Sequence, residues 1–581
     1  MSDNKNALLA IVLSVIIIML FEVFYNVSEQ SEISADKSVV DPVITPEADD
    51  NKNRANLPVP KIKEITSDAP STTSSSVDRA EPARISINSE KLVGSMSLTG
   101  MRIDDIKLVQ YKEKLDKDSP DVRVLSPSTG YGGYFLQTGW VSESKDVVLP
   151  DKNSEWVSSA DEIRPGSPVK LTWDNGEKVL FEQTIHLDDQ YIFSITQKVI
   201  NNSSKNIKIF PYGLISRKGT PDTLGFFILH EGAVGFVDNQ LEEIDYDELR
   251  ENQKFEKTVK GGWFGFTDKY WLVSFLPPQN RGADFRAFHV VDENKENMYQ
   301  VDYLLSQESI KPGEEGETVT KFFVGPKSID LLDSYSHEFS IPKFDLAIDF
   351  GWFYFLTKPL FYLMKFLYDL IGNYGVVIFV ITAIIRILLF PLANKQFASM
   401  NHMKQVQPEI VRLRERFAED KARLNQEMMK LYKEKKINPA AGCLPIFIQI
   451  PIFFALYKVL FVAIEMRHAP FFGWIHDLSV PDPTSMFNLF GLLPFTPPDF
   501  LTIGVWPLLM GLSMYIQQKL SPTPPDPIQA KVFMFLPFFF TILLANFPSG
   551  LVIYWFFNNV HSIAQQAYLM KSSPKDTPSA E

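Results

Sequence analysis

The sequence IGNYGVVIFVITAIIRILLFPLAN (residues 371–394) is an apolar run long enough to cross a bilayer, with Arg386 as its only charged residue. A helix rises about 1.5 Å per residue, so Arg386 lies about 13 Å from Lys395, the first charge beyond the run. That distance exceeds the reach of an arginine side chain, so we expect the guanidinium inside the inner leaflet. A charge there costs at least about 2.5 kcal/mol and usually faces a polar cavity on a functional path. The alternative is a structural arginine paired with a carbonyl group or a lipid phosphate.

The chain around this run divides into an acidic, polar first half and an apolar, Phe-rich second half. Its 581 residues are too many for a single domain, and the net charge of −13 averages two unlike halves. The one cysteine, Cys443, excludes an intramolecular disulfide and cannot by itself build a zinc or redox site. No HExxH, Walker-type or GxSxG pattern occurs. We therefore expect no enzyme, no catalytic residue, no cofactor and no metal.

The N-terminus is expected to be a membrane anchor. Residues 7–21 are almost continuously apolar, follow Lys5 and lack a small-residue cleavage site, which favours an uncleaved signal anchor over a removable signal peptide. The Ser-, Thr-, Pro- and acid-rich residues that follow cannot bury enough apolar surface to fold. We assign residues 1–27 to the anchor span and residues 28–83 to a disordered tether.

Residues 84–340 show the period of two that is typical of strands. Apolar and polar positions alternate along residues 191–199, and an Asn-Asn-Ser-Ser turn follows at 201–204. Similar short runs recur at residues 169–173, 179–186 and 205–215. Many strands separated by Gly, Asn and Pro turns predict one large all-β sandwich.

The second half offers five further candidates for membrane spans: residues 371–394, 442–464, 500–518, 532–547 and 550–569. Residues 341–370 are also apolar but carry several charges, so we expect an amphipathic helix lying in the interface. The loop 395–436 carries eleven Lys or Arg, whereas residues 465–500 carry only Arg467. The positive-inside rule therefore places the first loop in the cytoplasm and the second outside. Six spans result, with both termini cytoplasmic, an outer β-domain, a core at residues 371–569 and a short tail at 570–581.

The basic loop, residues 395–438, has a helical period of its own. Its apolar positions predict two amphipathic helices that form a cytoplasmic hairpin, with Pro408 as a kink or break. Arg412 and Arg414 belong to the basic surface of this hairpin. Met428 and Met429 supply either an adaptable binding face or packing between the two helices.

Other polar residues of the candidate spans are expected at the depth of Arg386. Thr382 lies one turn away on the same helix face, and Gln449 lies about 10 Å from the cytoplasmic start of its span. In the last span, Tyr554 and Asn558 recur at helical spacing, in the half nearer the cytoplasm. Because the outer halves are apolar and aromatic, the pattern predicts a polar cavity open only to the cytoplasm. A conducting pore would need a polar lining from end to end. The alternative is that the amides hydrogen-bond the helices together.

A half-open cavity suits the transfer of short hydrophilic segments across lipid, where their backbone and charges lose water. A fixed guanidinium would attract an acidic segment, and neighbouring apolar helices could receive a hydrophobic one.

Four runs carry a resemblance to a known family: NPAAGCLPIFIQIPIFFALY (438–457), APFFGWIHDLS (469–479), FPSGLVIYWFFNN (547–559) and TAIIRILLFPL (382–392). Over about residues 344–569 the chain resembles YidC-type membrane protein insertases of the YidC/Oxa/Alb family. The anchor and the outer β-domain resemble the Gram-negative form, which implies a bacterial inner-membrane protein with a periplasmic β-supersandwich.

The resemblance also implies roles for particular residues. The implied substrate groove comprises Arg386, Thr382, Gln449, Tyr554, Trp555 and Asn558. The implied hydrophobic slide comprises Ile450, Pro451, Phe453, Phe535 and Phe539. The implied partners are nascent membrane proteins, Sec translocon components, membrane lipids and, through the basic loop, the ribosome, without direct nucleic-acid readout. The short tail after Leu569 implies that ribosome contact rests mainly on the hairpin.

Two other functions remain open at this stage. A transporter or channel could use Arg386 as an anion or substrate site, but such folds often contain repeats of broken helices, and no repeat is found. An envelope assembly protein could use the β-domain alone, although six spans with a polar inner half exceed what an anchor requires.

Overall fold

The structure is a computed structural model that describes residues 83–572, apart from 128–132, 145–146, 224–228, 253, 293–294, 419, 436–443, 494, 496, 499–501 and 521–526. The predicted anchor (1–27), the tether up to residue 82, the end of the hairpin loop and residues 573–581 lie outside the described residues. Among the described residues, one compact unit holds 375–451 and 480–572, and the other holds 83–374 and 452–479. Each unit is described by itself.

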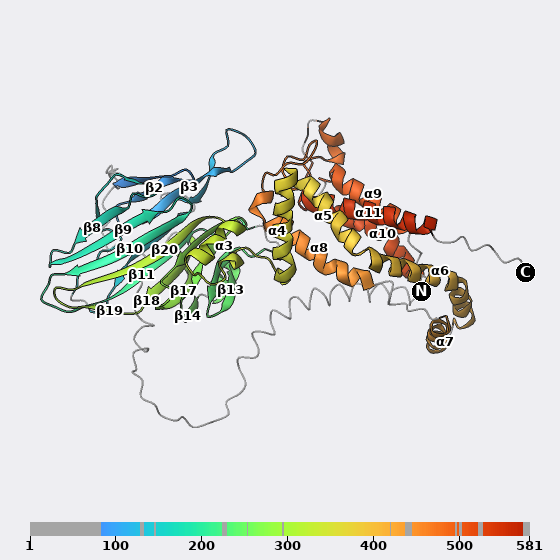
Figure 1. Cartoon of the computed structure of the whole chain (residues 1–581), viewed down its shortest axis with the longest axis horizontal. Coiled ribbons are helices and arrows are strands. Elements are labelled where there is room, and N and C mark those ends of the chain that lie inside the picture. The colour runs from blue at the N-terminus through green and yellow to red at the C-terminus, as the bar shows by residue number, and fades with distance from the viewer. Residues whose placement is uncertain are drawn as a thin grey trace, which may run out of the picture. The chain divides into compact units, whose positions relative to one another are not determined.

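The β-domain belongs to the second unit and consists of two sheets (Figure 1). The first sheet runs in the order β14 (Lys254–Lys260), β17 (Gly282–Val291), β18 (Asn297–Leu305), β11 (Ile207–Lys218), β5 (Tyr134–Val141), β3 (Arg102–Lys112), β2 (Leu92–Ser97), β1 (Arg84–Asn88) and β7 (Glu162–Ile163), with β19 (Glu308–Ile310) on β11 and β4 (Asp121–Leu125) on β3. The second runs in the order β13 (Gln240–Asp245), β12 (Gly232–Val237), β15 (Trp263–Thr267), β16 (Trp271–Leu276), β20 (Glu315–Pro326), β10 (Ile192–Asn201), β9 (Val179–Leu187), β8 (Val169–Asp174) and β6 (Val157–Ser158). A short helix, α2 (Tyr246–Asn252), follows β13. The expected β-sandwich is confirmed.

The alternating sequence predicts the buried face of β10 correctly. Phe193, Ile195 and Val199 are buried, and the residues between them are partly exposed. Gln197 is also buried on this face, and its side chain donates a hydrogen bond of 2.8 Å to the carbonyl oxygen of Gly139 in the opposite sheet. Polar side chains therefore help to fix how the two sheets face each other.

Aromatic side chains fill most of the space between the sheets. The ring of Trp140 on β5 lies 5.1 Å from that of Phe181 on β9, and Phe275 on β16 lies 4.9 Å from Tyr303 on β18. Thr138 donates a hydrogen bond of 2.6 Å to Gln183 across the same layer. Such aromatic residues bury a large apolar area each, so this layer is the main source of stability in the β-domain.

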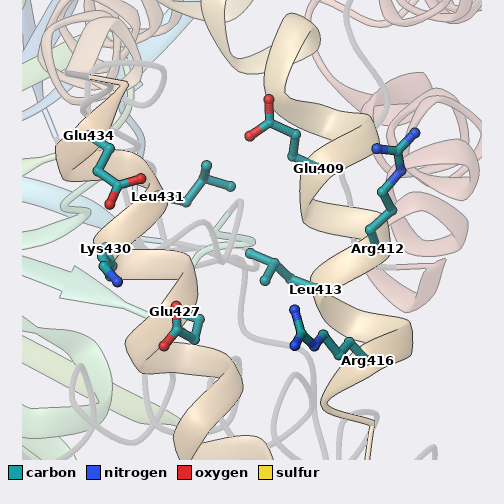
Figure 2. A pocket seen from close by; sticks show the side chains of 8 residues that line it. All are labelled: Glu409, Arg412, Leu413, Arg416, Glu427, Lys430, Leu431 and Glu434. Atoms are coloured by element: carbon teal, nitrogen blue, oxygen red, sulfur yellow. The ribbon is translucent and has the colours of Figure 1, made fainter.

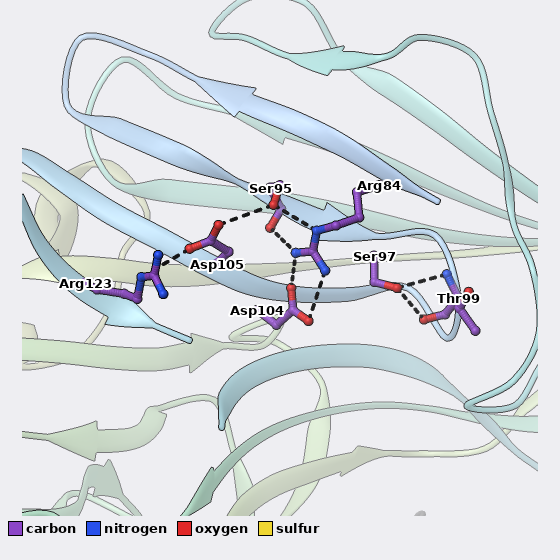
Figure 3. Close-up of polar contacts among 7 residues, drawn as sticks. All are labelled: Arg84, Ser95, Ser97, Thr99, Asp104, Asp105 and Arg123. Carbon is purple, nitrogen blue, oxygen red and sulfur yellow. Dashed lines mark hydrogen bonds and ion pairs between the residues drawn. The ribbon is translucent and has the colours of Figure 1, made fainter. Parts of the chain in front are cut away.

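The start of the β-domain is fastened by a polar network (Figure 3). Arg84 on β1 donates a hydrogen bond of 2.9 Å to the Ser95 hydroxyl and forms an ion pair with Asp104 on β3. Asp105, the next residue of β3, pairs with Arg123 on β4 at 3.4 Å. These contacts tie four strands together at the first described residues of the domain.

Two helices and a 3₁₀ turn follow the last strand: α3 (Ile329–Glu338), η2 (Phe344–Ala347) and α4 (Tyr354–Ile371). The two lysines of α4 contact residues of its own unit: Lys358 pairs with Asp333 at 3.0 Å and with Asp345 at 2.7 Å, and Lys365 pairs with Asp330. In contrast, Phe355 and Leu370 are strongly exposed. The helix is amphipathic, as expected, with its lysines bound to the protein and an apolar surface left exposed.

The remaining helices are α5 (Tyr374–Leu388), α6 (Phe390–Arg416), α7 (Lys421–Glu434), α8 (Leu444–Val462), α9 (Val505–Leu520), α10 (Pro527–Leu543) and α11 (Ser549–Ser572), with 3₁₀ turns η4 (Ile464–Met466), η5 (Met486–Gly491) and η7 (Leu544–Asn546) (Figure 1). Within the described residues, no helix combines the length and the apolar character that a membrane crossing requires.

The expected span at residues 371–394 is divided between two helices. α5 ends at Leu388, and α6 begins at Phe390 with Pro391 in its first turn, where the missing N–H of proline costs no hydrogen bond. Arg386 therefore lies in the last turn of α5, where the helix dipole favours a cation. α6 continues through Pro408, which excludes the expected break there.

Candidate functional site

The guanidinium group of Arg386 is held by the side chain of Asn558 on α11. Its Nε and Nη2 atoms donate hydrogen bonds of 2.9 and 2.7 Å to the same oxygen, Oδ1 of Asn558. Ser562, one turn further along α11, donates a hydrogen bond of 2.9 Å to the backbone carbonyl of Asn558. The arginine is thus held by a neutral amide, which does not itself cancel its positive charge.

A second polar pair lies one turn earlier on α11. The side-chain amide of Gln449 on α8 donates a hydrogen bond of 3.0 Å to the hydroxyl of Tyr554, which is buried. Tyr554 and Asn558 are four residues apart and share a face of α11. The structure therefore brings Gln449, Tyr554, Asn558 and Arg386 together through two links to one helix face.

Two further residues predicted for the groove have other partners. Thr382 is buried, and its hydroxyl donates a hydrogen bond of 2.6 Å to the carbonyl of Ile378 in its own helix. Trp555 packs in an apolar cluster of α9, α10 and α11, with its ring 5.6 Å from that of Phe540. Both side chains therefore support the helices around the Arg386–Asn558 pair.

The α9–α11 contact contains a polar link that the sequence analysis did not single out. Asn559 on α11 donates a hydrogen bond of 3.0 Å to the hydroxyl of Ser513 on α9, and both residues are buried. Asp482 caps α9, since its carboxylate accepts a hydrogen bond of 2.9 Å from the backbone N–H of Trp506. The helical spacing of polar residues in the last span could have identified Asn559. Nothing in the sequence indicated that its partner is Ser513.

The residues predicted for the slide divide by exposure. Phe535 and Phe539 on α10 are exposed, as is Ile450 on α8, whereas Pro451 and Phe453 are partly buried. Further residues of α10 share this exposure: Phe533, Met534, Phe538, Ile542 and Leu543. Helical spacing could have identified part of this larger set, because Met534, Phe538 and Ile542 are four residues apart and lie next to Phe535 and Phe539.

The hairpin helices α6 and α7 pack through an apolar cluster of Val406, Ile410, Leu431 and Tyr432, with Met428 against it. Asp420 caps α7 by accepting a hydrogen bond of 3.0 Å from the backbone N–H of Arg423. Met429 is exposed, so of the two methionines Met428 takes the packing role.

A pocket of about 270 Å³ lies between the hairpin helices (Figure 2). Its lining comprises Glu409, Arg412, Leu413 and Arg416 from α6, and Glu427, Lys430, Leu431 and Glu434 from α7. Leu413 and Leu431 point toward each other across the gap, and charges of both signs surround them (Figure 2). Arg412 lines this pocket, whereas Arg414 lies outside its lining and is partly buried. The balance of charge gives the pocket no preference for either sign of ligand.

The chemistry of the Arg386 site is electrostatic. An arginine stays protonated and offers several N–H donors, while amide and hydroxyl neighbours carry no charge. Among the described residues, Arg386 forms no ion pair with a carboxylate, so the site can attract an anionic group. In the described part of the chain, no cluster of His, Cys, Asp and Glu has a geometry that could hold a metal ion.

Comparisons with known proteins cover nearly the whole chain. The family model described as "60Kd inner membrane protein" matches residues 366–576, and the one described as "YidC periplasmic domain" matches residues 84–363. A protein of Rickettsia felis named "Membrane protein insertase YidC" is 49% identical over 84% of this chain and 87% of its own length. A protein of the same name from Beijerinckia indica is 44% identical over 98% of this chain and 96% of its own length.

Among solved structures, the crystal structure titled "Active YidC insertase crystal structure with the first transmembrane domain resolved" matches 83% of this chain and 92% of its own. The identity is 16% and the TM-score is 0.35. The two family models and the relatives agree in both halves of the sequence, and this chain belongs to the YidC family of membrane protein insertases.

Proposed function

We propose that this chain is a membrane protein insertase of the bacterial inner membrane that moves short hydrophilic segments of small membrane proteins through a polar groove open to the cytoplasm. The groove centres on Arg386 and Asn558, and the apolar surface of α10 receives the hydrophobic helix of the substrate before it enters the lipid. The curated relatives carry the name of this activity over nearly their full length.

The main support for a functional groove at Arg386 is that the hydrogen-bond partner of this arginine is neutral. An isolated charge in an apolar environment is costly, and a structural role would be served best by a carboxylate that cancels it. Instead, Asn558 Oδ1 accepts both hydrogen bonds, at 2.9 and 2.7 Å, and the net charge is kept. A retained positive charge in the same compact unit as an exposed apolar helix suits a substrate with an acidic segment next to a hydrophobic one.

We further propose six spans with cytoplasmic termini and a periplasmic β-domain. Support comes from residues 452–479, which share a compact unit with the β-domain, whose family model is described as periplasmic. Arg467 in the loop after α8 donates hydrogen bonds of 2.5 and 3.2 Å to the carbonyl oxygens of Lys112 and Glu113. The basic hairpin then lies at the opposite, cytoplasmic end of α8, as its eleven Lys and Arg favour.

The proposed partners are nascent membrane proteins and components of the Sec translocon. The hairpin of α6 and α7 is the proposed contact for the ribosome, because its exposed surface includes Arg412 and Arg416. The resemblance to the family is the basis for both partners.

The test uses the purified full chain in liposomes with a small membrane protein made by in vitro translation. Protection of its translocated segment from protease is compared with empty liposomes for the unmodified chain, Arg386→Lys and Arg386→Ala. Each is assayed with the substrate and with a version whose acidic residues in that segment are replaced by Asn or Gln. Arg164→Ala, an exposed arginine of the β-domain, is the matched control.

The proposal expects protection that depends on the chain, a loss for Arg386→Ala confined to the acidic substrate, and retention by Arg386→Lys and Arg164→Ala. Equal activity of Arg386→Ala on both substrates would remove the charge from the mechanism. No protection by a folded chain would favour a transporter that binds anions at Arg386, which anion-flux measurements would then test.

A further inference from the structure

The loop after α8 ends in an exposed aromatic turn. Phe471, Phe472, Gly473 and Trp474, here called the aromatic tip, follow Pro470 without an intervening charge. Phe472 is 64% exposed and Trp474 is 39% exposed. Two large aromatic side chains exposed within three residues of one turn form a small apolar surface, and such a surface can mark an interaction site.

Backbone hydrogen bonds hold the aromatic tip in a defined turn. The backbone N–H of Phe471 donates a hydrogen bond of 2.9 Å to the carbonyl of Ile475, and that of Leu478 donates one of 2.9 Å to the carbonyl of Ala469. Gly473 has φ of +71°, a left-handed conformation that favours glycine at the apex. Ile475 and Leu478 are buried beneath the turn. The aromatic residues therefore project from a fixed base.

The base is fastened to the β-domain before the tip and by a hydrogen-bonded turn of its own after it. Before the tip, the guanidinium of Arg467 lies 5.6 Å from the ring of Trp271 and bonds the carbonyl of Lys112. After the tip, Asp477 accepts hydrogen bonds of 2.8 and 2.7 Å from the N–H and hydroxyl of Ser479. These contacts fix the positions of the residues on either side of the tip.

Three observations favour lipid over protein as the partner. Pro470 follows the end of the apolar helix α8, Val462, by only eight residues, so the tip is close in the chain to a proposed span. The same compact unit exposes a second aromatic set on and before α4, including Trp352, which is 91% exposed. The tip itself presents only two large exposed side chains, too few for a standard protein interface. Exposed Trp and Phe next to spans are characteristic of the membrane interface.

We propose that the aromatic tip inserts Phe472 and Trp474 into the outer leaflet of the inner membrane, which fixes the end of α8 and holds the attached β-domain at the membrane surface. This inference rests on the proposed periplasmic position of the loop. The polar residues on either side, Arg467 and His468 before it and His476 and Asp477 after it, would lie at the level of the headgroups.

The test labels single cysteines with the fluorophore NBD in the full chain, with Cys443→Ser as the background. Phe472→Cys and Trp474→Cys report on the tip, Lys152→Cys on an exposed aqueous loop of the same unit, and Phe535→Cys on the exposed face of α10. Emission is recorded in liposomes, with quenching by doxyl-labelled lipid and by aqueous iodide. Thermal unfolding of each variant confirms that the exposed substitutions leave the fold intact.

The proposal expects blue-shifted emission at both tip positions, with lipid quenching severalfold stronger than at Lys152→Cys and iodide quenching severalfold weaker. Water-like emission that iodide quenches would overturn it. So would an apolar signal without lipid quenching, because the tip would then be covered by protein.

A separate measurement distinguishes failure of this inference from failure of the topology. His476→Cys lies in the exposed part of the loop and is treated in spheroplasts with a membrane-impermeant maleimide. Modification places the loop in the periplasm, so a water-like tip would then contradict lipid insertion alone. Protection that ends only on lysis would place the loop in the cytoplasm and overturn both.

Discussion

Lys458, in the apolar helix α8, forms an ion pair with Asp349: its Nζ atom lies 2.7 Å from Oδ2 of the carboxylate, and both side chains are largely buried. Asp349 also accepts hydrogen bonds from the backbone N–H groups of His230, at 3.1 Å, and Gly351, at 3.0 Å. One carboxylate therefore joins the β-domain, the segment before α4 and the second half of α8.

This arrangement predicts unequal costs for removing the two partners. Asp349→Ala leaves Lys458 and two backbone donors without their acceptor, whereas Lys458→Met leaves a carboxylate that still accepts two hydrogen bonds. Breaking a buried pair costs about 3–5 kcal/mol, so we expect Asp349→Ala to lie within that range and Lys458→Met below it. Chemical unfolding in detergent measures both, and equal losses would show that the backbone hydrogen bonds contribute little.

Glu465, in η4 after α8, predicts a pH dependence of stability. Burial raises the pKa of its carboxyl from 4.5 to about 6, although the hydroxyl of Ser328, 3.3 Å away, and the charge of Lys365 oppose the shift. The folded state therefore binds more protons than the unfolded state between these values. This contribution to stability is fully present below pH 4.5 and is lost as the pH rises through 6.

Glu465→Gln should remove that dependence and, above pH 7, stabilise the fold by up to about 2 kcal/mol, since one pKa unit corresponds to about 1.4 kcal/mol. Unfolding free energies of the variant and the unmodified chain are compared at pH 4.5, 6 and 7.5. Glu177→Gln, at an exposed turn of the β-domain, is the control for a change of net charge. Parallel pH curves for Glu465→Gln and the unmodified chain would contradict the assignment.

Local patterns predict those parts of the fold in which neighbouring residues decide the structure. The alternation in residues 191–199 predicts β10 and its buried face because the side-chain period of a strand is two. The acid at Asp420 before a helical period predicts the start of α7. These elements need no knowledge of distant contacts.

Distant contacts account for what the sequence could not predict. Lys458 looks like a charge that reaches water near the end of a span, and its partner, Asp349, lies far away in the sequence. For the candidate site, estimates of depth predict that Arg386 and Asn558 lie at the same level, and the structure joins them by two hydrogen bonds. The groove around them stays a prediction, as does the slide, because depth along a helix does not determine which side chains face a cavity.

The contact between α9 and α10 predicts an effect of adding a single methyl group. A Cβ atom on Gly511 would overlap the hydroxyl oxygen of Thr541, which is held by a hydrogen bond of 2.7 Å to the carbonyl of Pro537. Alanine favours a helix over glycine by about 1 kcal/mol, but overpacking costs about 1–3 kcal/mol. We expect Gly511→Ala to destabilise the protein and Thr541→Ala to restore stability when combined with it. A stabilised single variant in thermal unfolding would show that the two helices separate readily.

Replacing the neutral partner of Arg386 tests the charge without removing the arginine. Asn558→Asp places a carboxylate where Oδ1 now accepts hydrogen bonds of 2.9 and 2.7 Å, so an ion pair cancels the positive charge. Asn558→Ala removes the amide and leaves the charge in place. If attraction of an acidic segment contributes about 1.4 kcal/mol to the transition state, Asn558→Asp should lower its insertion rate about tenfold, whereas Asn558→Ala retains most of it.

The insertion rate into liposomes is compared for substrates with and without acidic residues in the translocated segment. A selective loss for the acidic substrate in Asn558→Asp supports an electrostatic role of Arg386, since the arginine is still present. Equal loss for both substrates, or a larger loss in Asn558→Ala, would mean that the amide acts by holding the geometry of α5 against α11. In that case the contact of Phe379 with Phe557, whose rings lie 4.9 Å apart, becomes the next position to vary.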